Sequence, residues 1–277
     1  MLGKLFKYEV KATGRMILPF YAGLLGMTLL FRIFSAIRMP ARFSELYDVF
    51  TVLATAIFLI LIMSTFFVCF IVMLTRFYKN IYGDEGYLMN TLPVSAAQNI
   101  WAKVFCSVVW YLASFVVCGI TGFIFFFGGY LSEIANGFRS FWSALIYEVL
   151  PQLTMYGTFS AAGIFTELLL MMLVSLFSAP LMMYLCISIG QKMPRHKILG
   201  AFGAYLAITC ALQTLMSLGG VVFGLTADSF WINDFIMNRP TTFMMLFLGG
   251  TLVLQLVLGV IAFFVTNHLL SKQLNLE

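Results

Sequence analysis

The sequence predicts an all-α polytopic membrane protein with six transmembrane helices. Of its 277 residues 62% are hydrophobic and 10% are charged, against about 25% charged residues in a typical soluble domain. The mean hydropathy is +0.99. Six stretches reach the ~20 apolar residues that a helix needs to cross a bilayer: about 17–37, 49–75, 100–130, 161–190, 198–224 and 243–266. No interval between them is long enough for a soluble domain, so we expect a single transmembrane domain over residues 1–277.

Residues 1–16 predict a helix that lies on the inner membrane surface before the first span. Four basic residues fall within about 80° of one another on a helical wheel, and most apolar residues lie elsewhere: Lys4, Lys7, Lys11 and Arg15. A basic stripe beside an apolar face suits the interface with anionic lipid. Glu9 breaks the pattern, because it points into the apolar face. The alternative interpretation is a positive flank that only sets topology.

The polar segment between the second and third spans has room for a short helix of its own. Gly83, Gly86 and Pro93 bracket it, and Asp84 is placed to cap it. Tyr87 and Leu88 would give that helix an apolar face near the loop tip. Exposed apolar residues at such a tip need a cover, which is either a partner protein or the bundle and lipid beneath it.

The third span has a capping signature at its start. Ser95 followed by Gln98 forms a capping box, so we expect this helix to begin just after Pro93. The basic stretch 190–199 predicts a tight turn between the fourth and fifth spans. In the long connection 131–160, Trp142, Ile146 and Val149 have helical spacing, which indicates a short amphipathic helix.

Charge places both termini in the cytoplasm. Five of the 16 Lys and Arg residues fall on the outer side when the spans alternate in direction: Arg32, Arg38, Arg42, Arg139 and Arg239. The other eleven fall on the inner side, as the positive-inside rule requires. The net charge of +5 is thus an orientation signal, and we expect no nucleic-acid partner. All five cysteines fall within or at the edges of spans, which argues against a disulfide framework.

Recognisable enzyme chemistry is missing from the sequence. There is no phosphate-binding Gly-x-x-x-x-Gly-Lys-Ser/Thr loop, so ATP hydrolysis would have to come from another chain. The two histidines, His196 and His268, have no Cys or acidic neighbour at metal-ligand spacing. We therefore expect no enzyme, no catalytic residue, no metal and no cofactor in this chain.

Polar residues inside the spans are candidates for a transport route. Gln213 and Gln255 lie near the middle of the fifth and sixth spans, where they would hydrogen-bond each other or a partner helix. Glu167 lies near the outer end of the fourth span, where it would reach water or Arg139. For all three residues, a purely structural role is the alternative.

The order of these elements resembles the permease subunits of type-2 ATP-binding-cassette (ABC) exporters. The stretches 1–15, 83–95, 190–191 and 196–199 look like those of such permeases in Gram-positive bacteria. The resemblance implies that residues 1–16 form the elbow helix and that the loop carries the coupling helix, which docks on a cytosolic ATPase. The residues that it assigns to ATPase coupling are Asp84, Glu85, Tyr87, Leu88, Met89 and Thr91.

The resemblance implies an exporter of an amphipathic or hydrophobic substrate, such as a peptide, a lipid-like molecule or a drug. The partners would be a cytosolic ATPase, which binds ATP and Mg²⁺, and a second permease chain, identical or paralogous. The location would be the bacterial plasma membrane, and antimicrobial peptide resistance would be one use. The alternative is a membrane immunity or sensor protein that binds an antimicrobial peptide without transporting it.

Overall fold

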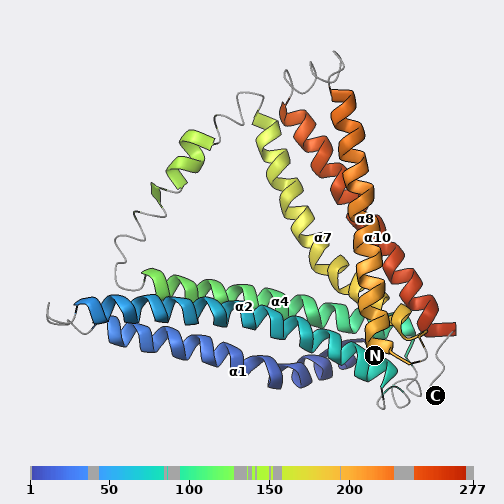
Figure 1. Ribbon diagram of the computed structural model, residues 1–277, viewed down its shortest axis with the longest axis horizontal. Coiled ribbons are helices and arrows are strands. Elements are labelled where there is room, and N and C mark those ends of the chain that lie inside the picture. The colour runs from blue at the N-terminus through green and yellow to red at the C-terminus, as the bar shows by residue number, and fades with distance from the viewer. Residues whose placement is uncertain are drawn as a thin grey trace. The chain divides into compact units, whose positions relative to one another are not determined.

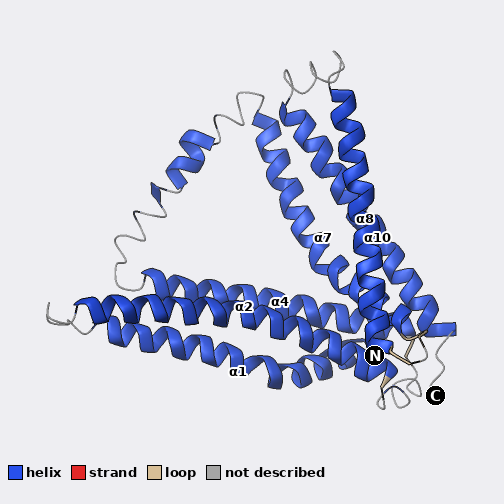
Figure 2. Ribbon diagram, in the orientation of Figure 1, coloured by secondary structure: helices blue, strands red, loops and turns tan. Residues whose placement is uncertain are grey.

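The computed structural model describes residues 2–36, 44–83, 94–127, 142–149, 158–193, 195–227 and 240–272, with a few single residues between them. These ranges are helical apart from short turns and contain no strand (Figure 2). Six of the described helices are long and apolar enough to cross a membrane. The expected polytopic, all-helical membrane protein is therefore confirmed.

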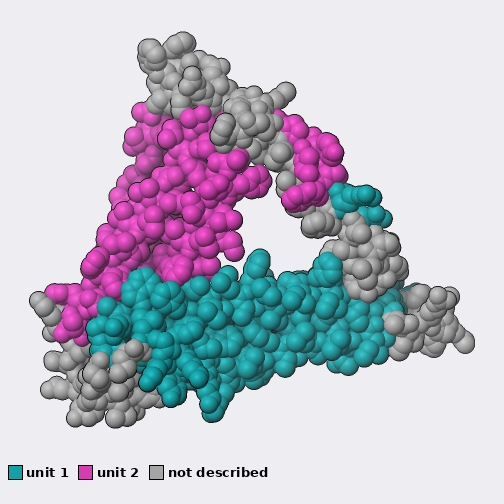
Figure 3. Space-filling model, turned by 180° about the vertical axis from the view of Figure 1, so that it is seen from behind, with its two compact units in different colours: residues 1–140 teal, residues 141–277 magenta. Residues whose placement is uncertain are grey.

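The chain forms two compact units, Met1–Ser140 and Phe141–Glu277 (Figure 3). The first unit contains α1 (Leu2–Ala36), α2 (Ser44–Tyr82) and α4 (Ala96–Phe127), which contact one another in all three pairs (Figure 1). Each helix contains one predicted span or nearly all of it. The helices exceed the predicted spans because polar residues continue the helical backbone beyond the apolar stretch.

Helix α1 is a single helix of 35 residues with Pro19 inside it. The separate interfacial helix expected over residues 1–16 is therefore not confirmed. At ~1.5 Å per residue, α1 is about 52 Å long, against about 30 Å for the hydrocarbon core of a bilayer. In its first turns, Phe6 and Val10 pack against the apolar cluster that α1 shares with α2 and α4, and Glu9 bonds side chains of both α2 and α4. These contacts hold the first turns in line with the rest of the helix.

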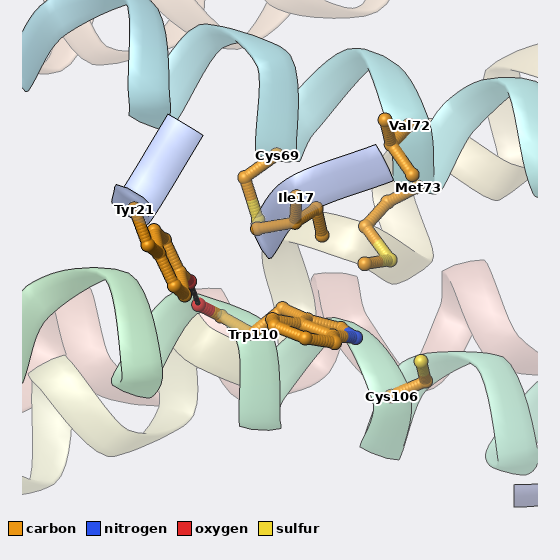
Figure 4. Close-up of a cluster of buried hydrophobic side chains, with 7 residues drawn as sticks. All are labelled: Ile17, Tyr21, Cys69, Val72, Met73, Cys106 and Trp110. Atoms are coloured by element: carbon orange, nitrogen blue, oxygen red, sulfur yellow. Dashed lines mark hydrogen bonds between the residues drawn. The ribbon is translucent and has the colours of Figure 1, made fainter. Parts of the chain in front are cut away.

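Apolar side chains from all three helices fill the interior of the first unit. One cluster brings together Ile17, Tyr21, Cys69, Val72, Met73, Cys106 and Trp110 (Figure 4). A second cluster contains Leu24, Phe31, Ala54, Phe58, Cys118 and Phe125. The rings of Phe58 and Phe125 stack with centroids 4.2 Å apart. These clusters join α1, α2 and α4 along most of their length.

The second unit contains η2 (Leu145–Val149), α7 (Thr158–Gly190), α8 (Lys197–Ala227) and α10 (Pro240–Lys272). Helix α7 packs against both α8 and α10. The five-residue π-helix η2 lies where an amphipathic helix is expected, although much of that connection lies outside the described residues.

Helices α7 and α10 run in the same direction and approach closely at small residues. A Cβ on Gly163 would overlap the side chain of Met245, and one on Gly259 would lie 3.1 Å from Cβ of Ser178. Small residues allow this kind of approach between membrane helices.

The predicted tight turn between the fourth and fifth spans is confirmed. Helix α7 ends at Gly190, and the Met193 amide donates to the Gly190 carbonyl at 3.1 Å. A Cβ on Gly190 would overlap the backbone of Ala201 in α8. Glycine is needed here because the two backbones touch.

Candidate functional site

The most polar part of the described core is a buried cluster of charged and amide side chains around Glu9. The side chains of Glu9 and Lys103 are 6% and 3% exposed, and Lys103 Nζ donates to Glu9 Oε1 at 2.6 Å. Asn80 Nδ2 donates to the same oxygen at 2.9 Å. Arg76 Nε lies 3.8 Å from Glu9 Oε2, which makes an ion pair without a hydrogen bond. One carboxylate of α1 thus binds side chains of both α2 and α4.

The cluster carries one negative and two positive charges. Glu9 is the only acid that pairs with Lys103 and Arg76 among the described residues. Removing charges from water costs several kcal/mol per ion, which the paired geometry must offset. Arg76 is partly exposed, but its Nε is buried without a hydrogen-bond partner among the described residues, and so is Asn80 Oδ1. Glu9 is consequently the group on which the neutralisation of both cations depends.

Hydrogen bonds extend from this cluster along the α1–α4 interface. Thr13 Oγ1 accepts from Trp110 Nε1 at 2.7 Å, and the hydroxyls of Tyr21 and Ser114 lie 2.8 Å apart. The Tyr21 hydroxyl also lies 3.3 Å from the Trp110 carbonyl (Figure 4). The two helices are therefore fixed to each other by polar contacts over several turns.

At the other end of α1, Arg32 also forms hydrogen bonds with α4. Its guanidinium donates to the backbone carbonyls of Ile124 at 2.6 Å and Phe125 at 2.7 Å. Hydrogen bonds from a charged donor are stronger than those from a neutral one. This contact therefore holds α1 and α4 together at the end opposite the Glu9 cluster.

The Glu9 cluster lies near the two helix ends that flank the 84–93 loop. Arg76 is about 9 Å along the axis from Tyr82, the last residue of α2, and Lys103 is about 10 Å from Ala96, the first residue of α4. The loop thus leaves one helix and enters the next within two turns of the cluster.

Both helix ends at the loop are capped. The Gly83 amide bonds the carbonyls of Tyr78 and Lys79, each at 3.2 Å, and closes the end of α2. At the other end, the Gln98 amide donates to Ser95 Oγ at 3.3 Å, so the predicted cap of the third span is confirmed.

The residues predicted to couple to an ATPase all lie outside the described residues: Asp84, Glu85, Tyr87, Leu88, Met89 and Thr91. The predicted basic stripe is described, and its four members are exposed: Lys4, Lys7, Lys11 and Arg15. On the same turns, Glu9 and Thr13 lie on the buried face, and the membrane-interface role of the basic stripe stays a prediction.

The three polar residues predicted for a transport route lie on three different helices of the second unit. Gln255 donates to Ser178 Oγ of α7 at 3.2 Å, whereas Gln213 is exposed on α8. Glu167 is half-buried beside Gly249 of α10: its Oε1 lies 3.4 Å from the position that a Cβ would take there. Its Oε2 is buried without a hydrogen-bond partner among the described residues.

Sequence reasoning missed the grouping of Glu9, Lys103, Arg76 and Asn80. Glu9 did stand out as an acid on an apolar helix face, which is the signal that a partner is needed. Lys103 and Arg76 were counted only as topology charges, because their spacing along the chain gives no hint that they share one carboxylate. The described residues contain no group of three or more His, Cys, Asp or Glu that could hold a metal ion.

No family model, curated protein or solved structure matches the chain.

Proposed function

We propose that the chain is the permease subunit of an ATP-driven exporter of the type-2 ABC kind, driven by a separate cytosolic ATPase. The observation that carries this proposal is the buried Glu9 cluster, because it ties α1, α2 and α4 together beside the 84–93 loop. A loop that only links two spans needs no such bracing. A loop that receives a push from a partner does, since the force has to reach whole helices.

The mechanism follows from how the first unit is held together. Closure of the ATPase on its nucleotide pushes the 84–91 segment, and the push enters α2 and α4 at their capped ends. Lys103 and Asn80 pass the displacement to Glu9, and the Thr13–Trp110 and Tyr21–Ser114 contacts keep α1 in step with α4. The three helices then tilt as one body. The ATPase shifts the equilibrium between the two tilts of these helices only if its contacts with the chain differ between the two tilted states.

The proposed assembly has two permease chains, identical or paralogous, and two ATPase subunits that bind ATP and Mg²⁺. It lies in a bacterial plasma membrane with both termini in the cytoplasm, an orientation that rests on the Lys and Arg distribution. The many exposed apolar side chains of the six helices suit contact with lipid and with an amphipathic or hydrophobic substrate.

The test is a pair of substitutions in the loop, Tyr87→Ser with Leu88→Ser. The variant should insert normally, but it should lose transport-coupled ATP hydrolysis in the assembled complex. The matched control is Tyr8→Ser, which removes an aromatic side chain that is 71% exposed on α1, and it should hydrolyse ATP at the wild-type rate. Unchanged coupling in the loop variant would refute the assignment.

A further inference from the structure

The turn between α7 and α8 carries positive charges that no carboxylate neutralises. The side chains of Lys192 and Arg195 are exposed, and that of Lys197 is half-buried. None of the three forms an ion pair with a described residue. The sequence has no acid between Glu167 and Asp228, and α10 contains none. The cations of this turn therefore need an anion from outside the second unit.

Large apolar side chains follow these cations directly on α8. Ile198, Leu199 and Phe202 are 74%, 65% and 59% exposed. At 100° per residue they lie within an arc of about 100° on the helix, and the exposed Leu206 continues the same face one turn further. On a helix that is long and apolar enough to cross a membrane, such a face lies against lipid acyl chains.

The geometry of the turn keeps the cations next to this apolar face. A Cβ on Gly190, the last residue of α7, would overlap the backbone of Ala201 in α8, so the two helices meet immediately at the turn. Lys197 precedes Ile198 by one residue, which is about 1.5 Å along the helix axis. The positive charges thus lie where the acyl chains end and the phosphate groups of the lipids begin.

We infer that the 192–197 turn binds the phosphate group of an anionic phospholipid, whose acyl chains cover the apolar face that begins at Ile198. Basic side chains near a membrane surface attract anionic lipids, and a single lipid meets both the cations and the apolar face. A soluble acidic protein would neutralise the cations but would leave the apolar face, which continues into the span, without a cover. The binding needs neither ATP nor a partner chain.

The probes are phosphatidylglycerol and phosphatidylcholine with the same acyl chains, each carrying a photoreactive diazirine near the top of one chain. The purified chain is placed in phosphatidylcholine nanodiscs that contain one probe at the same low mole fraction. After irradiation, mass spectrometry locates the label within residues 198–206. The phosphatidylglycerol probe should label this stretch at least about fivefold more than the phosphatidylcholine probe, the preference expected from one basic residue near anionic lipid.

The test variant combines Lys192→Gln, Arg195→Gln and Lys197→Gln. In this variant the two probes should label residues 198–206 equally, with the helicity of the chain unchanged. A second measurement needs no substitution: in the wild type, the preference should fall as the salt concentration is raised, because exposed charges are screened.

The matched control removes the same charge from the exposed basic stripe of the first unit, by Lys4→Gln, Lys7→Gln and Lys11→Gln. It should keep the wild-type preference at residues 198–206, since the net charge of the chain does not decide the outcome. An excess of inorganic phosphate at constant ionic strength should also leave the preference unchanged, because the acyl chains contribute to the binding.

The inference is overturned if the two probes label the wild type equally, if the 192–197 variant keeps the preference, or if the control variant loses it as well. Loss of the preference in inorganic phosphate would show a site for free anions and would overturn the lipid assignment. A chain that engages no ATPase would still show the preference, so failure of the export function gives a different result.

Discussion

Breaking the Glu9–Lys103 pair should destabilise the first unit unequally, depending on which partner is removed. Glu9→Gln leaves the buried Lys103 and the partly exposed Arg76 without a counter-charge. Lys103→Met leaves Glu9 with Arg76 at 3.8 Å and with the Asn80 hydrogen bond. The loss of the carboxylate is therefore the more costly change.

The size of each change in the free energy of unfolding follows from how deeply the unpaired charge is buried. Lys103 is 3% exposed, so leaving it unpaired should lower the free energy of unfolding by about 3–5 kcal/mol, the usual cost of a broken buried pair. For Lys103→Met we expect about 1–3 kcal/mol, because a second cation remains. The double variant should cost about as much as Lys103→Met alone, since Arg76 is partly exposed and can reach water. The coupling energy between the two sites then equals the cost of Glu9→Gln alone, about 3–5 kcal/mol.

The assay is reversible unfolding of the purified chain in mixed micelles, followed by helicity and by tryptophan fluorescence. Lys79→Met is the control, because Lys79 is an exposed lysine on the same helix as Asn80, and it should change the free energy by less than about 0.5 kcal/mol. Equal costs for the two single variants, or strict additivity in the double variant, would refute the reasoning.

Three further variants test individual contacts. Trp110→Phe removes the donor to Thr13 at 2.7 Å and should cost about 1–2 kcal/mol in the same assay, whereas the change should have little effect when Thr13 is already valine. Gly190→Val should lower the thermal midpoint and the yield of folded protein, because its Cβ would overlap the backbone of α8. A Cβ on Gly203 meets no atom within 4 Å, so Gly203→Val should be tolerated. Ser95→Ala should cost about 0.5–2 kcal/mol by removing the cap of α4; a neutral effect would show that the cap contributes nothing.

Most of the helical architecture could be predicted, because an apolar stretch long enough to cross a bilayer has few alternatives. The turn at Gly190 and the cap at Ser95 depend on neighbouring residues, so they too could be read from the sequence. The continuity of α1 through Pro19 could not be predicted from the sequence. The charge pattern of residues 1–16 describes only the exposed face, whereas the contacts of Glu9 and Thr13 with α4 hold the helix in line.

The Glu9 cluster marks the limit of sequence reasoning in this chain. An acid on an apolar helix face shows that a partner is needed, but the partners come from α2 and α4, which hydrophobic periodicity cannot place. Gln255 illustrates the same limit. The sequence left Gln213 or another helix open as its partner, and the structure gives Ser178 of α7. The role of the 84–91 segment stays a prediction, since these residues lie outside those that the structure describes, apart from Gly86.

The central claim is that a separate ATPase drives this membrane chain. The most direct measurement is affinity purification from native membranes in mild detergent, with quantitative mass spectrometry of the proteins that co-purify. The proposed function predicts an ATPase with a phosphate-binding loop at one copy per chain. Recovery of the chain without any ATPase, even with nucleotide and cross-linker present, would contradict it and leave a binding or immunity protein as the better description.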